Sequence, residues 1–261
     1  MTTPEPDLSI VIPAYNEENR LGRTLGRIRD YLSGLEIPPE KFEILVVDDG
    51  SKDGTARVVA EWTKSMPSLR LVSNGENRGK GYSVRHGMLE ARGRISLFTD
   101  ADLSSPIEEL EKLLTTIAAG NDVAIGSRAV DRSLITIHQS RLREMAGILF
   151  NAFVRLFTGL PLHDTQCGFK AFVSAPSRIV FEQQRIERFG FDPEVLFLAK
   201  RHGLRIAEVP VRWAHDPATK VHVVRDSLMM FGDLIRIRRN WLRGFYATGQ
   251  KPGAACTEKN A

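Results

Sequence analysis

Residues 42–55 read FEILVVDDGSKDGT, an apolar run that ends in two aspartates and a polar loop. A short run rich in β-branched residues, without polar alternation, is typical of a strand buried on both faces of a sheet. The Asp53-Gly54 pair supplies turn geometry and a cap for a following helix. We therefore expect a buried strand over Phe42–Val47 that leads through this loop into a helix.

The same order of apolar run, loop and helix-like stretch recurs on both sides of this segment. The other runs are Leu8–Ile12, Leu69–Val72, Ile95–Phe98 and Val123–Ile125. Short apolar strands that alternate with helical segments indicate βαβ units and a mostly parallel sheet flanked by helices. The sequence thus predicts an α/β, Rossmann-like fold, in which ligands bind outside the carboxyl ends of the strands.

Acidic side chains follow three of these strands. They are Glu17 and Glu18 after the first run, Asp48 and Asp49 after the second, and Asp100 and Asp102 after Ile95–Phe98. Carboxylates at a common edge repel one another unless a cation or hydrogen-bond donors compensate. A ligand site at this edge of the sheet is therefore expected.

The Asp100-Ala101-Asp102 triplet is the sharpest local feature. Carboxylate oxygens suit Mg²⁺ and Mn²⁺, and Mg²⁺ is usually held by one or two carboxylates together with substrate phosphates. An isolated triplet can instead form a turn that caps the helix expected near Pro106, but the neighbouring acidic strand ends favour a metal site. The loop Asn77–Gly81 (NRGKG) suits an anion near its amides, although it matches neither the P-loop nor the dinucleotide fingerprint.

The composition is that of a soluble globular protein, with 42% hydrophobic and 26% charged residues among 261. The most apolar region, Ile148–Leu162, is interrupted by Asn151, Arg155 and Gly159, so no transmembrane helix is predicted. The acidic N-terminus lacks the order of a secretion signal. Two cysteines are too few for a disulfide framework or a zinc site, so we expect a cytoplasmic chain with reduced thiols.

Positive charge is concentrated towards the C-terminus. Lys200–Tyr246 holds ten Lys and Arg residues against four Asp and Glu, within a net charge of +4. Apolar residues at helical spacing over Val221–Tyr246 alternate with arginines, which is typical of a basic amphipathic helix at a membrane surface. The helix expected over Leu142–Phe157 also carries more apolar surface than one core contact requires. Nucleic acid is disfavoured as a partner, because few aromatic residues accompany these arginines.

The segment Asp164–Lys170 (DTQCGFK) combines an acid, an amide, a thiol and an amine. A thiol nucleophile needs a partner base, and His163 lies next to the wrong end of the segment. Cysteine catalysis is therefore not expected, and the histidines show no metal-ligand spacing.

Taken together, these segments resemble the family 2 inverting glycosyltransferases with the GT-A fold, and most of all the dolichyl-phosphate β-glucosyltransferases. The matching stretches are VIPAYNEE (Val11–Glu18), VVDDGSKDGT (Val46–Thr55), NRGKG (Asn77–Gly81), TDADL (Thr99–Leu103), GSRA (Gly126–Ala129), SRLR (Ser140–Arg143), DTQCGFK (Asp164–Lys170), FDPEVL (Phe191–Leu196) and TKV (Thr219–Val221). NRGKG with DTQCGFK is specific to the polyprenyl-phosphate glucosyl branch. Related mannosyl-phosphate synthases usually carry glutamine after the D-x-D motif, where this chain has Ser104-Ser105, which argues against GDP-mannose.

The resemblance implies roles for individual residues. The catalytic residues would be Asp100, Asp102 and Asp164, with Asp164 orienting the acceptor rather than deprotonating it. A Mg²⁺ or Mn²⁺ ion would bind at Asp102 and Asp100. The nucleotide sugar would contact Pro13, Ala14, Tyr15, Glu17, Asp48, Asp49, Lys80, Asp100, Ala101 and Asp102, and donor or acceptor phosphates would contact Arg128, Arg141, Gln166 and Lys220.

The resemblance also implies a domain organisation and a reaction. A single GT-A domain would span residues 1–246, with a nucleotide-sugar half (1–103), an acceptor half (104–216) and a basic helical element (217–246), before a disordered tail (247–261). The reaction would be an inverting transfer of glucose from UDP-glucose to a polyprenyl phosphate, with GDP-mannose or a soluble acceptor as alternatives. Without a membrane anchor in this sequence, we expect peripheral attachment to the cytoplasmic face of a membrane.

Overall fold

The computed structural model describes residues 5–35, 37–215 and 223–246, apart from the side chains of residues 141–143 and 223–228. A seven-stranded sheet with the order β3-β2-β1-β4-β7-β5-β8 runs through the molecule, and β6 and β9 form a separate pair. The strands are β1 (Leu8–Ala14), β2 (Phe42–Asp48), β3 (Leu69–Ser73), β4 (Ile95–Thr99), β5 (Val123–Ser127), β6 (Ile135–Ile137), β7 (Phe169–Val173), β8 (Ile206–Pro210) and β9 (Trp213–Ala214).

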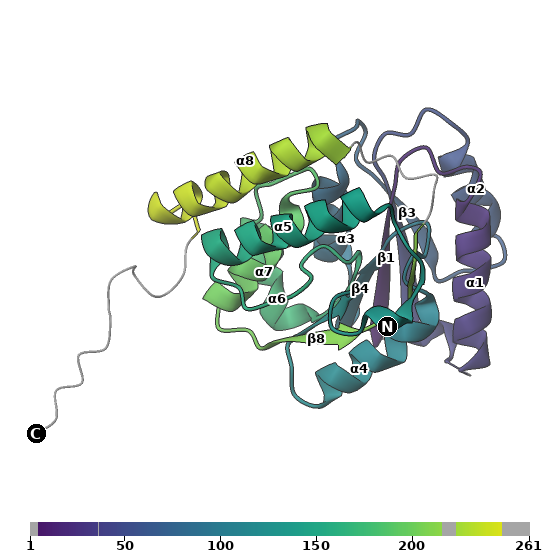
Figure 1. Cartoon of the computed structure of the whole chain (residues 1–261). Coiled ribbons are helices and arrows are strands. Elements are labelled where there is room, and N and C mark those ends of the chain that lie inside the picture. The colour runs from purple at the N-terminus through teal and green to yellow at the C-terminus, as the bar shows by residue number, and fades with distance from the viewer. Residues whose placement is uncertain (1–4, 36, 216–222, 247–261) are drawn as a thin grey trace, which may run out of the picture.

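Helices cover both faces of the sheet (Figure 1). One face packs against α1 (Leu21–Gly34), α2 (Thr55–Trp62) and α4 (Leu110–Ala118). The other packs against α3 (Lys80–Glu90), α5 (Arg141–Thr158), α6 (Ser174–Gln183), α7 (Phe191–Arg201) and α8 (Val223–Leu242). Short 3₁₀ helices span Pro39–Lys41, Ile107–Glu109 and Arg132–Leu134. The predicted α/β fold class is confirmed.

The apolar runs identified in the sequence form β1 to β5. Successive strand residues point to opposite sides, and in β1, β2, β4 and β5 both sides are largely buried, whereas the edge strand β3 leaves Leu71 exposed. In β1, for example, Ile10 and Ile12 contribute to one core and Val11 to the other, and all three are fully buried.

One strand runs against the others. β7 lies between β4 and β5 and is antiparallel to both, whereas the other neighbouring pairs of the sheet are parallel. The sequence pattern alone does not give the direction of this strand. Its insertion brings the segment just before it to the carboxyl end of β4, since the start of an antiparallel strand faces the end of its neighbour.

The two helices expected to carry extra apolar surface pack against each other. They are α5 and α8, and the Phe231 ring contacts Phe153 and Phe157 edge to face, with centroids 5.1 and 5.7 Å apart. Tyr246, beyond the end of α8, donates from its hydroxyl to Glu194 Oε1 of α7 at 2.5 Å, which ties the segment after α8 to α7. None of the described helices has both the length and the apolar character needed to cross a membrane.

Candidate active site

A cavity of about 350 Å³ opens at the carboxyl ends of β1, β2 and β4, as expected for this fold class. We call it the donor cavity. Of the residues predicted to bind the nucleotide sugar, it is lined by Pro13, Ala14, Tyr15, Glu17, Asp49, Lys80, Asp100, Ala101 and Asp102. The structure therefore brings these predicted residues together around one space.

Asp48 is the exception. Its Oδ1 atom accepts a hydrogen bond from the backbone N–H of Ser51 at 3.1 Å, and it does not line the donor cavity. Asp48 and Asp49 are adjacent, so their side chains leave the strand end in different directions. Asp48 stabilises the loop after β2. Because it does not line the donor cavity, the structure does not support its predicted contact with the donor.

Asp49 holds a loop that borders the donor cavity. Its Oδ2 atom accepts from the backbone N–H of Gly79 at 2.8 Å, and Oδ1 accepts from the N–H of Arg78 at 2.9 Å and from Asn74 Nδ2 at 2.8 Å. The NRGKG segment is thus fixed against the end of β2. Gly79 has a φ of 106°, and a Cβ there would lie 2.6 Å from the carbonyl oxygen of Glu187, so glycine is needed.

The two carboxylates of the D-x-D triplet have different partners. Asp100 Oδ1 lies 2.5 Å from Lys80 Nζ. Asp102 Oδ1 accepts from the backbone N–H of Ser104 at 2.8 Å, so it ties a turn but does not cap α4. Leu103, the next residue, has a φ of 48°, which is strained for a leucine and is typical of a functional turn.

Burial and neighbouring charge set the ionisation of this group of residues. Burial raises the pKa of Asp102, and the negative charge of Asp100 raises it further. Burial alone would lower the pKa of Lys80, but Asp100 and Asp192 outweigh it and raise this pKa above its ordinary value. An added cation would therefore relieve the cost of charge at Asp102.

A glycine of the DTQCGFK segment packs directly against the D-x-D triplet. The Asp100 N–H donates to the Gly168 carbonyl oxygen at 3.2 Å, and a Cβ at Gly168 would lie 2.1 Å from Asp100 Oδ2. This contact follows from the antiparallel direction of β7. The contact places Gly168 of the DTQCGFK segment, which also carries the predicted acceptor residues, beside the predicted metal site.

Arg188 and Phe189, which no sequence motif indicated, also line the donor cavity. They lie in the loop between α6 and α7, with Gly190 between them and the FDPEVL segment. An arginine next to a phenylalanine is visible in the sequence. However, these residues are far along the chain from the strand ends, and they reach the donor cavity beside the start of α3, which no sequence pattern indicates.

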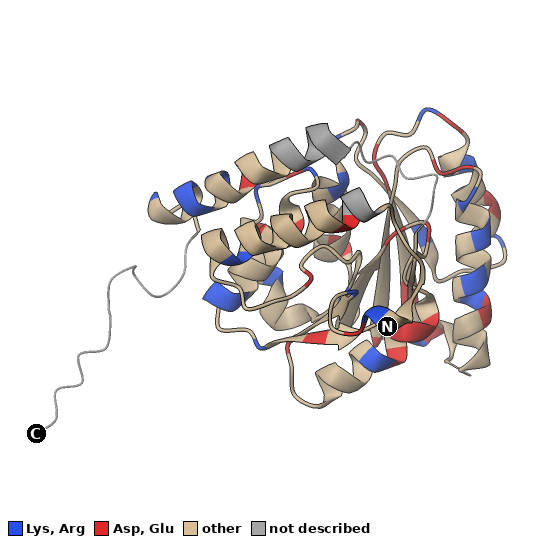
Figure 2. Cartoon of the chain, in the orientation of Figure 1, with Lys and Arg blue, Asp and Glu red and all other residues tan. Residues whose placement is uncertain are grey.

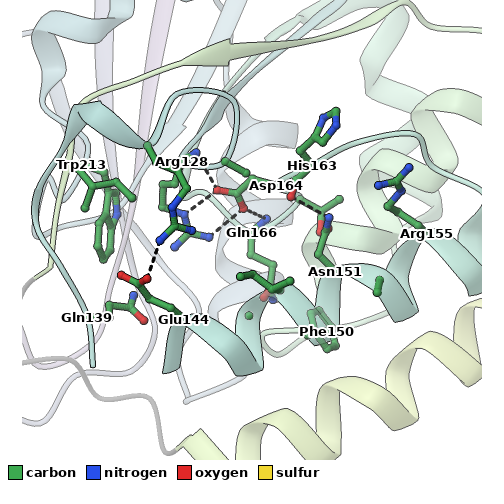
Figure 3. Close-up of a pocket in the computed structure, with 17 residues that line it drawn as sticks. Arg128, Gln139, Glu144, Phe150, Asn151, Arg155, His163, Asp164, Gln166 and Trp213 are labelled. Carbon is green, nitrogen blue, oxygen red and sulfur yellow. Dashed lines mark hydrogen bonds and ion pairs between the residues drawn. The ribbon is translucent and has the colours of Figure 1, made fainter. Parts of the chain in front are cut away.

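A second cavity, of about 370 Å³, lies between α5 and the loop after β5; we call it the acceptor cavity (Figure 3). It is lined by Arg128, Asp164 and Gln166 from the predicted acceptor set. Arg141 begins α5, but its side chain is outside the described part of the chain, as is the whole of Lys220.

The buried Asp164 forms an ion pair with the half-buried Arg128 in the acceptor cavity. Arg128 Nε and Nη2 lie 2.6 and 2.8 Å from the two carboxylate oxygens of Asp164 (Figure 3). The backbone N–H groups of Arg128 and Gln166 each donate a further hydrogen bond of 3.0 Å to this carboxylate. Burial alone would raise the pKa of Asp164, but Arg128 lowers it to about 2. Asp164 is therefore a poor proton acceptor near neutral pH.

Cys167 is not suited to be a nucleophile. Its side chain is buried, and burial together with the charge of Asp164 raises the pKa of the thiol to about 11. The reactive thiolate is thus scarce at neutral pH. Neighbouring Lys170, fully buried and paired with Asp192, donates to the Cys167 carbonyl oxygen at 2.6 Å.

An apolar strip lies on the outer face of α5. Met145, Ile148, Leu149 and Leu156 are between 59% and 75% exposed, and Ile235 and Leu242 of the adjoining α8 are also exposed. A contiguous exposed apolar surface marks a protein, lipid or ligand contact. The excess apolar surface expected from the sequence is thus placed on the outside of the molecule.

Comparison with known proteins decides the family. The sequence profile described as Glycosyl transferase family 2 matches residues 9–176. A dolichyl-phosphate beta-glucosyltransferase from Dictyostelium discoideum is 37% identical over 250 residues, covering 92% of this chain and 76% of the relative. The chain belongs to glycosyl transferase family 2. A dolichyl-phosphate beta-glucosyltransferase from Saccharomyces cerevisiae is likewise 37% identical, covering 94% of this chain and 78% of the relative.

Solved structures of other glycosyltransferases share the fold of this family 2 member. Mannosyl-3-phosphoglycerate synthase from Rubrobacter xylanophilus superposes with a TM-score of 0.63 at 21% identity, covering 96% of this chain and 79% of that one. Glucosyl-3-phosphoglycerate synthase from Mycobacterium tuberculosis, solved with Mn²⁺, UDP and glucosyl-3-phosphoglycerate, gives 0.59 at 19% identity, covering 93% and 80%. The predicted GT-A fold is confirmed.

Proposed function

We propose that this chain transfers glucose from UDP-glucose to a polyprenyl phosphate, with inversion at the anomeric carbon. The relatives with which it shares 37% identity are named dolichyl-phosphate beta-glucosyltransferases. The contact between Asp100 and Gly168 carries the proposal: it joins the donor cavity to a segment whose Asp164 and Gln166 line the acceptor cavity. Two substrates could therefore meet at the D-x-D triplet.

The acceptor phosphate needs no general base in this scheme. A phosphate monoester has a second pKa of about 6, so it is mostly a dianion near pH 7. Its oxygen forms a bond to the anomeric carbon while the bond from that carbon to UDP breaks, and UDP leaves with the electron pair. Asp164, held ionised by Arg128, would position Arg128 and the Gln166 backbone beside the acceptor rather than take up a proton.

The D-x-D residues fit a divalent cation. Among the described residues, no group of three or more His, Cys, Asp or Glu side chains could hold a metal ion. Asp100 and Asp102 offer two carboxylates, which matches Mg²⁺ or Mn²⁺ bound in part through substrate phosphates. Such an ion would supply charge stabilisation for the departing diphosphate. Asp102 would hold it, with Asp100 shared between the ion and Lys80.

A lipid acceptor requires contact with a membrane. The exposed strip of α5 offers apolar surface, and the arginines of α8 offer positive charge to anionic headgroups. We place this peripheral attachment on the cytoplasmic face, as the sequence leads us to expect. Sedimentation with vesicles at low salt is the direct test, and a chain that stays in the supernatant contradicts it.

A donor screen tests the reaction. The full chain is incubated with polyprenyl phosphate in detergent and either UDP-glucose or GDP-mannose, with and without a chelator. We expect UDP release coupled to a β-linked lipid phosphate product, with loss of both on chelation. Preferred use of GDP-mannose, or of a short water-soluble acceptor over the lipid, would contradict the proposal.

A further inference from the structure

Arginines from three elements line a pocket of about 520 Å³ beside α8, apart from the donor and acceptor cavities. Arg85 comes from α3, Arg185 from the loop between α6 and α7, and Arg236 and Arg239 from adjacent turns of α8. We call this space the arginine pocket. None of these residues belongs to either cavity of the proposed reaction.

Two of these arginines are held in place without being neutralised. Arg85 Nε donates to the carbonyl oxygen of Phe181 at 2.9 Å. The Arg185 guanidinium lies 5.2 Å from the centroid of the Phe245 ring. Within the described residues, none of the pocket arginines forms an ion pair with a carboxylate. Their remaining N–H groups can therefore donate to a ligand.

The acidic residues of the pocket are paired elsewhere. Glu182 lies 3.0 Å from Arg178, and Glu187 lies 2.5 Å from Arg78, neither of which lines the pocket. The four arginines outnumber the two glutamates that line the pocket, so an excess of positive charge remains that an anion would compensate. Arginine forks match phosphate oxygens in a bidentate manner. The charge of the pocket is thus complementary to a phosphate group.

Apolar side chains border the arginine pocket. Phe245 lines it and is 48% exposed, while Ile235 and Leu242 on the neighbouring side of α8 are 48% and 67% exposed. Figure 2 shows Lys and Arg positions in the coloured part of α8, towards its C-terminus. A free anion requires no apolar border, whereas a lipid presents its phosphate next to its acyl chains.

We propose that the arginine pocket binds the phosphate headgroup of an anionic membrane lipid. This inference rests on the membrane attachment proposed above and gives it a defined binding site. Occupation of the pocket would hold α8 against the bilayer, with the apolar strip of α5 beside it. The headgroup bound here is distinct from the acceptor phosphate, which would lie in the acceptor cavity.

Two double variants distinguish binding of a headgroup in the pocket from general attraction between surface arginines and anionic vesicles. The double variant R236Q/R239Q removes two pocket arginines. The control R238Q/R243Q removes two exposed arginines of the same segment that do not line the pocket, with the same change in net charge. Full-length proteins are sedimented with phosphatidylcholine vesicles, with and without phosphatidylglycerol. We expect roughly a tenfold or greater loss of partitioning to anionic vesicles for R236Q/R239Q, and a much smaller loss for the control.

A third variant tests the part of the pocket that lies off the helix. R185Q should weaken binding to anionic vesicles about fivefold, although Arg185 is not on α8. Thermal unfolding of each variant identifies any that fail to fold. Equal losses for both double variants, or an unaffected R185Q, would overturn the pocket in favour of general surface charge.

Two further measurements distinguish a lipid headgroup from a free phosphate as the ligand of the arginine pocket. Inorganic phosphate and glycerol phosphate are tested for stabilisation of the chain and for competition with vesicles. Stabilisation by these anions without vesicle binding would overturn the lipid assignment, as would an absence of binding to any anionic vesicle. Transfer to polyprenyl phosphate in detergent needs no bilayer, so the proposed reaction can fail or succeed independently.

Discussion

The ammonium group of Lys80 lies 2.5 Å from Oδ1 of Asp100, so the lysine of the NRGKG segment is ion-paired with the first D-x-D carboxylate. The pair joins two sequence motifs in the lining of the donor cavity. It leaves Asp102 as the carboxylate whose charge is least compensated, since burial and Asp100 both raise its pKa. The charge of Asp102 should therefore favour metal binding and catalysis but disfavour folding.

Replacement of Asp102 by asparagine tests this opposition. We expect kcat for transfer to fall roughly a hundredfold, because the second carboxylate for a cation is lost. Without metal, the melting temperature should not fall, since a partly buried and poorly compensated charge is removed. The exposed Asp30→Asn is the matched control. Retained turnover in Asp102→Asn would contradict the assigned metal site.

Replacement of Asp164 by asparagine leaves Arg128 with a neutral partner. We expect a loss of about 2 kcal/mol in the free energy of unfolding at pH 7, because the ionised carboxylate that Arg128 stabilises is removed. The pKa of Asp164 in the folded protein is about 2, below its ordinary value of 3.8. The stabilisation is thus complete above about pH 4 and is lost as the pH falls towards 2.

Denaturant unfolding of wild type and Asp164→Asn across this pH range checks the effect. The difference between them should shrink as the pH falls from 4 to 2. A constant difference would show that the charge of Asp164 is not its source. If Asp164 acted as a base in transfer, the variant would also lose an ionisation from the pH–rate profile near neutrality, which we do not expect.

Arg188→Gln tests the cation that the sequence did not reveal. Arg20 and Lys80 in the donor cavity are paired with Glu17 and Asp100, whereas Arg188 has no ion pair within the described residues. We expect kcat/KM for UDP-glucose to fall between tenfold and a hundredfold, since a charge-assisted contact to a phosphate is worth about 1.5–3 kcal/mol. Arg178→Gln, on the exposed face of α6, should change neither kcat nor KM. An unchanged Arg188→Gln enzyme would remove Arg188 from donor binding.

Gly168→Ala tests the contact between the two cavities. The new Cβ would lie 2.1 Å from Asp100 Oδ2, so either Asp100 or β7 must move. Because small misplacements of reacting groups are costly, we expect about a hundredfold loss of kcat. Gly34→Ala, where a Cβ meets nothing within 4 Å, should leave kcat unchanged. Full activity of Gly168→Ala would argue against close packing at this point.

The sequence predicted the parts of the site that follow parallel strands. Strand ends can be located from apolar runs, so Asp49, Asp100 and Asp102 were found. Periodicity could not separate Asp48 from Asp49, because the direction of each side chain depends on where the strand twists into its loop. The direction of β7 was also hidden, since a buried apolar strand has the same pattern in either orientation. Arg188 and the arginine pocket depend on contacts between distant segments.

The position of β7 has a consequence for biosynthesis. As the chain leaves the ribosome, β1 to β4 can pair before β7 has been synthesised. The outer edge of β4 then stays unpaired until the strand that begins at Phe169 is available. An unpaired edge is a site for association with other chains. Slow translation between β4 and β7 should therefore increase aggregation of newly made protein, and chaperones that cover strand edges should matter most during that interval.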